Sequence, residues 1–558
     1  MQHLTGFDGM FYAYDHSAVA PSVMGSLLVF APTQTNDAAD VSRVIARLEE
    51  RLDVIPPLRR IVAGVPTGVN NQYWREVPVN VRDHVREVTV AAPGGDREVA
   101  AAVAAIMQRR IGRDRPMWDY TILHGLSQRR VAHLVRVHHA ATDGGTMQRL
   151  IGLLGDEFTT AFTPTDSDRR PARRSRREEW VEMAGRGARR SVLLPLQLLT
   201  VAKDTGTWAK TRYEDEGLAA VPAMAARLLP GAVGQLACRL VGRNRAVGDT
   251  PVEPVVPRLP LPSTPFNAKL TDERRYAFFG LPLGDLLRVG KHYGVTLHTV
   301  LTAVSAGAAR RYLTRVGAPV DEPLILMSVY SLRKGHEDNY WANYASSFFG
   351  ELPVHVADPV QRLRVAHVNN KTARANFDTM PTEAMVDMSR MIPQTFWDLS
   401  VRLTDLMPEP VSRRTSMAGN FTISNIRGPG EHFRMFGHEA TGFYPVSFLF
   451  QGLAHNLTAS SYGDELQIGV VGCPTAFQDV WEWADLLRSE LAELVRIVDA
   501  PASPATTAPP ALATAASRSA SASKRPAARR ARTGSAALRA VPDPKPRATR
   551  RSTGASAG

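Results

Sequence analysis

The chain of 558 residues is too long for one ordinary hydrophobic core, and its 44% hydrophobic content is typical of a globular protein. Its two cysteines, Cys238 and Cys473, cannot build a disulfide framework, which excludes a disulfide-rich secreted fold and favours a reducing, cytoplasmic compartment. The net charge of +13 is unevenly placed, because residues 501–558 hold eleven Lys or Arg and one acidic residue, leaving only +3 for residues 1–500.

The sequence predicts neither a signal peptide nor a membrane-spanning segment. Met1–Asp8 lacks the charged and apolar regions of a signal peptide. No run of about 18 uncharged apolar residues occurs, so we expect no transmembrane helix.

The clearest local pattern lies between residues 131 and 154. Val131–Val137 is apolar and β-branched with rough alternation, which predicts a strand. Gly144 and Gly145 allow a tight turn, and Thr146 is suited to cap a helix that continues to Leu154. The residues between strand and helix are therefore expected on a loop that can present side chains to a cleft.

That loop carries the pattern HHxxxDG, from His138 to Gly144. Imidazole has an unperturbed pKa near neutrality, so a histidine here can act as a general base, with Asp143 fixing its tautomer or holding the loop. Adjacent residues of an extended segment point to opposite sides, so His138 and His139 are not expected to face one substrate or grip one metal ion. A core imidazole with satisfied hydrogen bonds is the alternative for either histidine.

Three further regions follow the motif. Asp168–Arg177 contains six arginines and predicts an exposed linker, and the broken amphipathic pattern from Glu178 to about Leu240 suits either a membrane interface or helices packed across a domain junction. Pro251–Pro265 is proline-rich and extended. We therefore place an N-terminal domain at 1–167, a basic and helical crossover linker at 168–265 and a second domain at 266–500.

The second domain is predicted to mix strands and helices, which makes the chain an α/β protein. The segments that predict strands are Arg274–Leu281, Pro323–Val329, Phe421–Ser424 and Leu466–Val471, and those that predict helices are Val300–Leu313 and Val480–Val498.

The tail, residues 501–558, is rich in Ala, Pro, Ser, Thr and Arg and is expected to be disordered. A basic tail can contact anionic lipid head groups or nucleic acid, or can simply aid solubility. No motif for specific nucleic-acid binding accompanies it, so a membrane surface is the preferred partner.

Several ordered elements together resemble the bacterial wax ester synthase/diacylglycerol acyltransferase family, and the heptad is shared with a broader superfamily of acyltransferases. The resemblance covers about residues 1–498. It rests on Leu4–Phe11, Pro57–Arg60, Arg115–Trp118, His138–Gly144, Ser424–Pro429, Tyr444-Pro445 and Gly452-Leu453.

The resemblance implies two chloramphenicol-acetyltransferase-like α/β domains with a tunnel between them. It also implies acyl-CoA as donor, diacylglycerol or a long-chain alcohol as acceptor, no cofactor and no metal. Such a protein is expected in the cytoplasm, peripherally attached to the inner membrane face or to lipid droplets.

The resemblance further suggests roles for individual residues. His139 is the expected general base, with His138 supporting it and Gly144 closing the motif. Asp143 is expected to hold the loop through an arginine, with Arg59 as the candidate partner. Donors to the oxyanion are needed as well, and the candidates are Asn425 and Arg427.

The second half departs from the family pattern at His298-Thr299, at Tyr330 and at Ala454-His455. These departures keep two alternatives open. One is a condensation-type transferase with another donor or acceptor, and the other is a lipid-binding or lipid-droplet protein that has lost activity. The chain lacks GxSxG, GxxxxGK[ST] and GxGxxG, so serine hydrolase, P-loop and Rossmann functions have no motif in their favour.

Overall fold

The computed structural model describes residues 2–32, 39–64, 72–157, 261–333, 340–378, 394–416, 419–429 and 432–500, with residue 392 and a few positions between 175 and 185. The arginine-rich linker, most of the amphipathic segment that follows it and the tail 501–558 lie outside these residues. The described elements belong to one compact unit, Met1–Ala500.

The first sheet has six strands, and β7 lies near its centre with almost every residue buried. β7 is antiparallel to both of its neighbours, β2 and β6. The strand order is β12 (Arg434–Met435), β13 (His438–Val446), β2 (Val23–Phe30), β7 (Val131–His138), β6 (Trp118–His124) and β5 (Val85–Thr89). Helices α1 (Gly6–Ala13), α2 (Val41–Arg51), α3 (Asp96–Gln108) and α4 (Gly144–Leu154) belong to this half, as does a small sheet of β1 (Gln2–His3), β4 (Tyr73–Glu76) and β3 (Arg60–Ala63).

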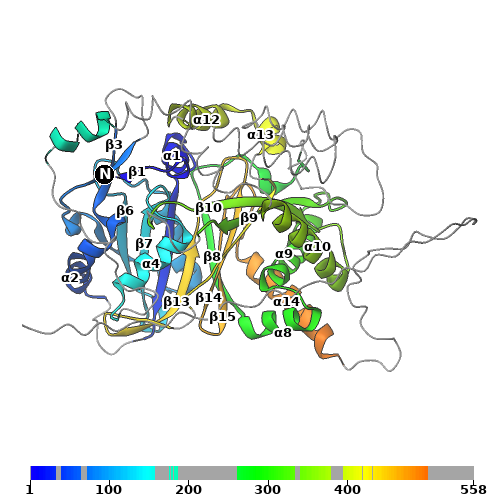
Figure 1. The fold of residues 1–558 in the computed structure, drawn as a ribbon. Helices are drawn as coiled ribbons and strands as arrows, with labels where there is room; N and C mark the ends of the chain where they lie inside the picture. Colours follow the sequence, from blue (N-terminus) through cyan, green and yellow to red (C-terminus); the bar gives the residue numbers. More distant parts are fainter. Residues whose placement is uncertain are drawn as a thin grey trace, which may run out of the picture. The chain divides into compact units, whose positions relative to one another are not determined.

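The second sheet also has six strands and is mixed, because β11 runs parallel to both of its neighbours while the other pairs are antiparallel. Helices α8, α9, α10 and α14 pack together on it (Figure 1). The order is β10 (Ala345–Leu352), β9 (Leu324–Ser331), β11 (Phe421–Ile426), β14 (His455–Tyr462), β15 (Glu465–Gly472) and β8 (Arg275–Pro282). The helices of this half are α8 (Leu283–Tyr293), α9 (Leu297–Arg315), α10 (Pro359–Asp378), α12 (Gln394–Leu406), α13 (Glu409–Thr415) and α14 (Glu482–Asp499).

One strand crosses between the halves. β13 comes from the C-terminal half of the sequence but pairs with β2 of the first sheet, with Tyr444 opposite Leu27. The Tyr444 ring lies 4.8 Å from the ring of Phe278 on β8, and the backbone N–H of Phe443 donates to Gln467 on β15. β13 therefore joins the two sheets along one seam, so the N-terminal sheet is completed by residues from the second predicted domain.

The fold class predicted from the sequence, α/β with two sheets, is confirmed. All six segments predicted in the second half are found as β8, α9, β9, β11, β15 and α14, and Val131–Val137 is found as β7. The helix after the motif begins earlier than predicted. Its N-cap is Asp143 rather than Thr146, because the Asp143 carboxylate accepts the N–H of Thr146, and the Thr146 hydroxyl accepts the N–H of Asp143. Among the described residues, no helix is long and apolar enough to cross a bilayer.

The departure at position 455 lies in the core of the second half. The His455 ring is fully buried, with ring centroids 4.0 Å from Phe421 and 4.9 Å from Trp483. Neither ring nitrogen has a hydrogen-bond partner among the described residues. Burial lowers the pKa of His455 to about 3, so the ring is neutral at pH 7. This residue is therefore part of the hydrophobic core.

Acidification is expected to lower the free energy of unfolding, and His455→Phe is expected to make this decrease smaller. The unfolded imidazole has a pKa of 6.5 and the folded one a pKa of about 3, so below pH 6.5 the unfolded chain takes up the proton first. Each pH unit in this window costs about 1.4 kcal/mol of unfolding free energy. Urea denaturation at pH 7 and at pH 4.5 should show a loss about 2–3 kcal/mol smaller in the variant. Equal losses in both proteins would contradict this account.

Candidate active site

The HHxxxDG loop connects the end of β7 to the start of α4, as the sequence predicted. The N–H of His138 donates to Met117 O and that of His139 to Ser22 O, at 2.9 and 2.8 Å, which fixes the backbone on both sides of the strand end. Gly144 faces Ile426 at the end of β11, where an added Cβ would lie 2.7 Å from the Ile426 side chain. The glycine therefore lets the second sheet approach the motif closely.

The His139 side chain lies between two aromatic rings. Its ring stacks on Phe11 of α1 at 3.8 Å and meets the edge of Phe448 at 5.2 Å. Burial lowers the pKa of His139 to about 4. The imidazole is therefore neutral at pH 7 and able to accept a proton. The Asp143 carboxylate opposes this shift, so it favours the imidazolium once a proton arrives.

The tautomer of His139 is set by Asn343. The Asn343 amide nitrogen donates to Asp8 Oδ1 at 2.8 Å and to the His139 carbonyl at 2.7 Å, which turns its Oδ1 toward His139 Nδ1 at 3.1 Å. Because an amide oxygen only accepts, Nδ1 must carry the proton. Nε2 then keeps its lone pair, and it has no hydrogen-bond partner among the described residues.

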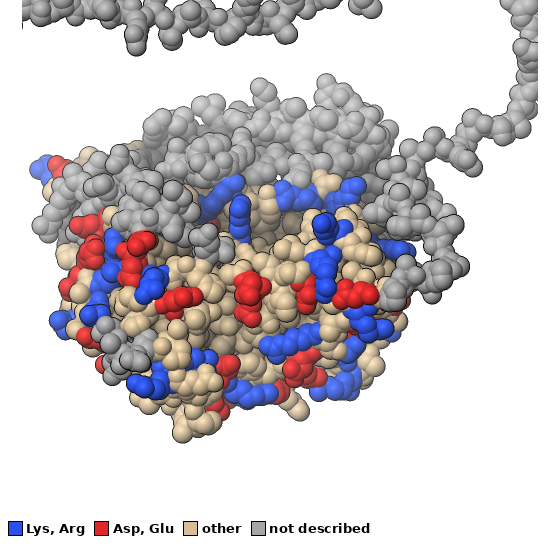
Figure 2. All heavy atoms as spheres, turned by 90° about the horizontal axis from the view of Figure 1, so that it is seen from below, with Lys and Arg blue, Asp and Glu red and all other residues tan. Residues whose placement is uncertain are grey.

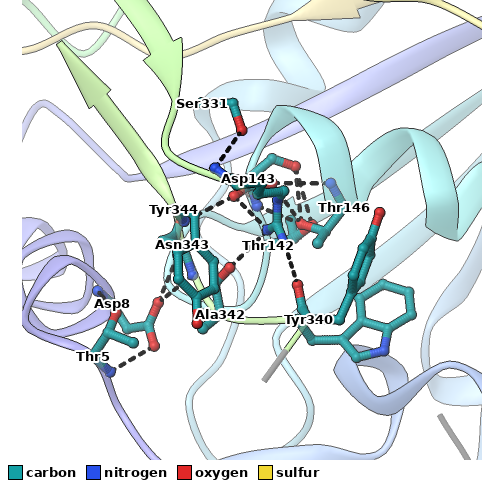
Figure 3. A network of polar contacts seen from close by, with 12 residues as sticks. Thr5, Asp8, Thr142, Asp143, Thr146, Ser331, Tyr340, Ala342, Asn343 and Tyr344 are labelled. Atoms are coloured by element: carbon teal, nitrogen blue, oxygen red, sulfur yellow. Dashed lines mark hydrogen bonds and ion pairs between the residues drawn. The ribbon is translucent and has the colours of Figure 1, made fainter. Parts of the chain in front are cut away.

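Asp8 anchors this arrangement from the first helix. It is fully buried, and burial raises its pKa, against the hydrogen bonds that it receives. Its Oδ1 accepts from the backbone and side-chain nitrogens of Asn343, and its Oδ2 accepts from the N–H of Thr5 at 2.8 Å, within the capping box of α1 (Figure 3). Residues 335 positions apart are thereby joined behind His139.

The His138 side chain points away from His139 and is fully engaged. Its Nδ1 accepts the N–H of Ala140 at 3.1 Å, and its Nε2 lies 3.0 Å from Asp15 Oδ1. Burial opposes ionisation of Asp15, but His138 and Arg113 outweigh it and lower the pKa of Asp15 to about 2. With both nitrogens occupied, His138 supports the loop, and His139 is the histidine with a nitrogen available for chemistry.

Asp143 pairs with Arg333. The Arg333 guanidinium lies 2.7 Å from Asp143 Oδ2, which also accepts the N–H of Tyr344 at 3.0 Å, while Oδ1 accepts from Thr146 (Figure 3). Burial would raise the pKa of Asp143, but Arg333 and these N–H groups hold it below its usual range. The loop is therefore bound to the end of β9.

The expected pair between Asp143 and Arg59 is wrong. Arg59 lies in the N-terminal half, where its Nε contacts Glu76 Oε2 at 2.8 Å and its Nη1 donates to Leu52 O at 3.1 Å. Only 1% of Arg59 is exposed. Arg59 comes directly before β3 and its side chain reaches Glu76 on β4 of the small sheet, whereas Arg333 follows β9 beside the motif.

The oxyanion candidates flank Ile426 at the end of β11. Asn425 is half-buried at the end of β11 and Arg427 is exposed just beyond it, on either side of the Ile426 that touches Gly144. Their roles stay predictions. His298, at the start of α9, is half-buried beside Ser328 of β9, with Nε2 3.4 Å from the Ser328 hydroxyl, and burial lowers its pKa to about 4.

A small, largely apolar pocket lies between the two sheets. Its volume is only about 10 Å³, room for about one water molecule, and its lining includes Met107 of α3, Tyr276 of β8 and Phe448. Phe448 therefore contacts both this pocket and the ring of His139.

Sequence reasoning missed Asn343, Arg333 and the role of Asp8. Signals for two of them were present. Asp8 lies in the N-terminal element that resembles the family, and Arg333 lies three residues after Tyr330, which was noted only as a departure from the family pattern. Asn343 had no local pattern to mark it, because its partners lie in α1 and in the motif.

Asn343→Ala is expected to lower kcat about 10- to 100-fold with little change in KM, because His139 would lose the acceptor that fixes its tautomer. A matched control is Asn267→Ala. Asn267 is also fully buried, but it donates to Gly419 O and Gly452 O in the second half. The control should lower thermal stability and leave kcat nearly unchanged in steady-state assays. Equal effects of both variants on kcat would show that Asn343 has only a structural role.

Comparison with known proteins identifies the family of this chain. Residues 4–301 match the wax ester synthase/diacylglycerol acyltransferase catalytic domain, and residues 341–495 match the WS/DGAT C-terminal domain. One protein of Mycobacterium tuberculosis, named "Putative diacyglycerol O-acyltransferase", is 26% identical over 501 residues, which are 89% of this chain and 91% of that protein. Another with the same descriptive name is 26% identical over 512 residues, 90% of this chain and 99% of its own length.

Two solved structures share the fold. The wax ester synthase/diacylglycerol acyltransferase from Marinobacter aquaeolei has a TM-score of 0.57 and 21% identity, over 89% of this chain and 100% of that chain. The first condensation domain of the calcium-dependent antibiotic synthetase has a TM-score of 0.50 and 14% identity, over 88% of this chain and 96% of that chain. The family resemblance seen in the sequence is confirmed by the two domain matches: this chain belongs to the WS/DGAT family of acyltransferases.

Proposed function

We propose that this protein transfers a long-chain acyl group from acyl-CoA to the hydroxyl of diacylglycerol or of a long-chain alcohol, forming triacylglycerol or wax ester. The observation that carries the proposal is the state of His139. Its Nδ1 is bound to Asn343 and its pKa is about 4, so Nε2 is a neutral base in a loop between the two sheets.

In the proposed reaction, His139 Nε2 takes the hydroxyl proton as the alcohol oxygen attacks the thioester carbonyl carbon. The tetrahedral intermediate collapses, the C–S bond breaks and the CoA sulfur takes the proton back from the imidazolium. A positioned base of this kind contributes about 10²–10⁴-fold to the rate. No covalent acyl-enzyme intermediate and no cofactor are required.

The surroundings of His139 suit an apolar acyl group. The rings of Phe11 and Phe448 cover the imidazole with apolar surface. A fatty acyl chain placed there would keep water away from the thioester, which favours transfer to an alcohol over hydrolysis. Asn425 and Arg427 remain the proposed donors to the oxyanion.

The decisive assay gives purified protein radiolabelled long-chain acyl-CoA with diacylglycerol, with a fatty alcohol or with no acceptor. Labelled triacylglycerol or wax ester, formed only with the matching acceptor, is the expected result. Transfer to an amine but not to an alcohol would favour a condensation-type enzyme. Binding of lipid without any product would favour a protein that has lost activity.

A further inference from the structure

Helix α12 (Gln394–Leu406) exposes an apolar face. Phe396, Leu399, Leu403 and Leu406 are 45, 57, 56 and 79% exposed. At 3.6 residues per turn, these four side chains fall within an arc of about 80° on the helix. They form one continuous stripe, which we call the α12 stripe.

The opposite face of α12 binds the protein through polar contacts. Asp405 accepts from the Ser17 hydroxyl at 3.0 Å and from the N–H of Ala18 at 3.1 Å. Gln394 donates to Gly9 O at 3.0 Å, and Asp398 lies 3.5 Å from His16. This orientation is the reverse of that in an ordinary surface helix, which buries its apolar face and exposes its acids.

The α12 stripe stands apart from other exposed apolar side chains. Nine large apolar residues of the described chain are strongly exposed, and five of them lie between Phe396 and Val411. The other four, Val181, Leu287, Val316 and Val368, are separated along the chain and occur singly. Single exposed apolar residues are ordinary, whereas a contiguous exposed patch marks an interaction site.

The charges around the α12 stripe favour an anionic lipid surface as its occupant. Asp398 and Asp405 are turned toward the protein, whereas Arg402 beside the stripe and Arg414 at the end of α13 are exposed. Among the described residues of α12 and α13 the exposed acid is Glu409, which is paired with Arg413 at 2.7 Å. Apolar side chains flanked by arginines are the pattern of a helix that lies in the plane of a membrane interface.

The α12 stripe is also close to the reacting histidine. α12 packs directly on α1, where Gln394 contacts Gly9, and two residues further along α1 the ring of Phe11 stacks on His139. Figure 1 shows α12 lying over α1 at one edge of the molecule. A surface bound by α12 would therefore lie one helix away from the site where a lipid alcohol must arrive.

We propose that α12 docks this protein onto an anionic phospholipid surface and presents the α1 side of the site to acceptor lipid held there. The lipid nature of the acceptor rests on the proposed function, but the docking itself does not require catalysis. Leu399 and Leu403 would enter the boundary between head groups and acyl chains, with Arg402 and Arg414 facing phosphates.

The test compares wild type with the double variant Leu399→Asp, Leu403→Asp in sedimentation with vesicles of phosphatidylcholine and phosphatidylglycerol. Both leucines are exposed, so the fold should be kept. In the proposed complex both leucines are buried in the bilayer. Their loss should weaken vesicle binding about 100-fold, since each buried leucine contributes about a factor of ten. The assay is run at low and high salt, because electrostatic binding by the basic residues of 501–558 is screened by salt, whereas binding by the α12 stripe persists.

The matched control is Leu287→Asp. Leu287 is 52% exposed on α8, at the opposite edge of Figure 1, and Figure 2 shows basic and acidic side chains interspersed over most of the face that is seen from below. This variant should bind vesicles as wild type does. Equal vesicle binding by wild type and the double variant at high salt would overturn the docking proposal.

Two further readouts separate the alternatives. Transfer to a water-soluble short-chain alcohol should be the same in all three proteins, while transfer to diacylglycerol in vesicles should fall only in the double variant. Loss of vesicle binding in a protein that transfers to no acceptor would support docking and overturn the proposed function. A dimer that the double substitution dissociates, seen by light scattering, would make the stripe a contact between copies and overturn the docking proposal.

Discussion

Replacing His139 with alanine is expected to lower the rate of acyl transfer by about 10²–10⁴-fold, to background in most assays, while leaving the fold largely intact. The variant removes the only ring nitrogen of the motif that keeps a free lone pair. Asn343 would still hold Asp8 and the backbone carbonyl of residue 139, so the contacts that order the loop survive. Circular dichroism and urea denaturation would show whether structure is kept.

The companion variant, His138→Ala, should have the opposite profile. His138 bridges Ala140 N–H and Asp15, so its loss should cost about 1–3 kcal/mol of stability through unsatisfied buried groups. Asp15 keeps its ion pair with Arg113 at 2.8 Å, which limits the damage, and a larger share of activity should remain. If His138→Ala proved the less active of the two at equal stability, the assignment of the base would have to be reversed.

The second large effect is expected at Asp143. Asp143→Ala should lose about 3–5 kcal/mol of unfolding free energy, because Arg333, whose side chain is only 13% exposed, would lose its carboxylate partner and α4 would lose its N-cap. Activity should fall as well, since the same loop carries His139. Thermal and chemical denaturation measure the stability loss directly.

A double-mutant cycle tests which arginine is the partner. Asp143→Asn and Arg333→Gln made singly and together should show a coupling above about 1 kcal/mol, since the two side chains are in contact. The same cycle with Arg59→Gln should be additive, because Arg59 contacts Glu76 instead. Additivity with Arg333, or coupling with Arg59, would refute the network described above.

Local patterns predicted most of the secondary structure because they depend on neighbours in sequence. The alternation of Val131–Val137 and the apolar spacing of Val480–Val498 report which faces are buried, and β7 and α14 are found there. The cap of α4 was misplaced because both Asp143 and Thr146 can cap a helix, and only the backbone conformation of Asp143 distinguishes them.

The side-chain pairs of the site could not be predicted in this way. Arg333 is 190 residues from Asp143, and Asn343 is 335 from Asp8, so neither pair leaves a periodic signal. Which strand end lies beside the motif depends on sheet order. The position of the motif on a loop between a strand and a helix was predicted correctly, because it depends on local residue types and spacing, whereas the role of His139 as a base stays a prediction.

The crossing of β13 has a consequence during synthesis of the chain on the ribosome. β2 and β7 emerge early, yet β13, the partner of β2, is completed only at Val446. Synthesis proceeds at about 5–20 residues per second, so after β7 is completed at His138 the free edge of β2 waits roughly 15–60 s for β13. This edge carries Leu27, Leu28 and Phe30, which are fully buried in the finished protein, so the nascent chain presents an adhesive apolar strand edge throughout this interval. Nascent-chain aggregation, and dependence on chaperones that shield such edges, should therefore peak before residue 446 is translated.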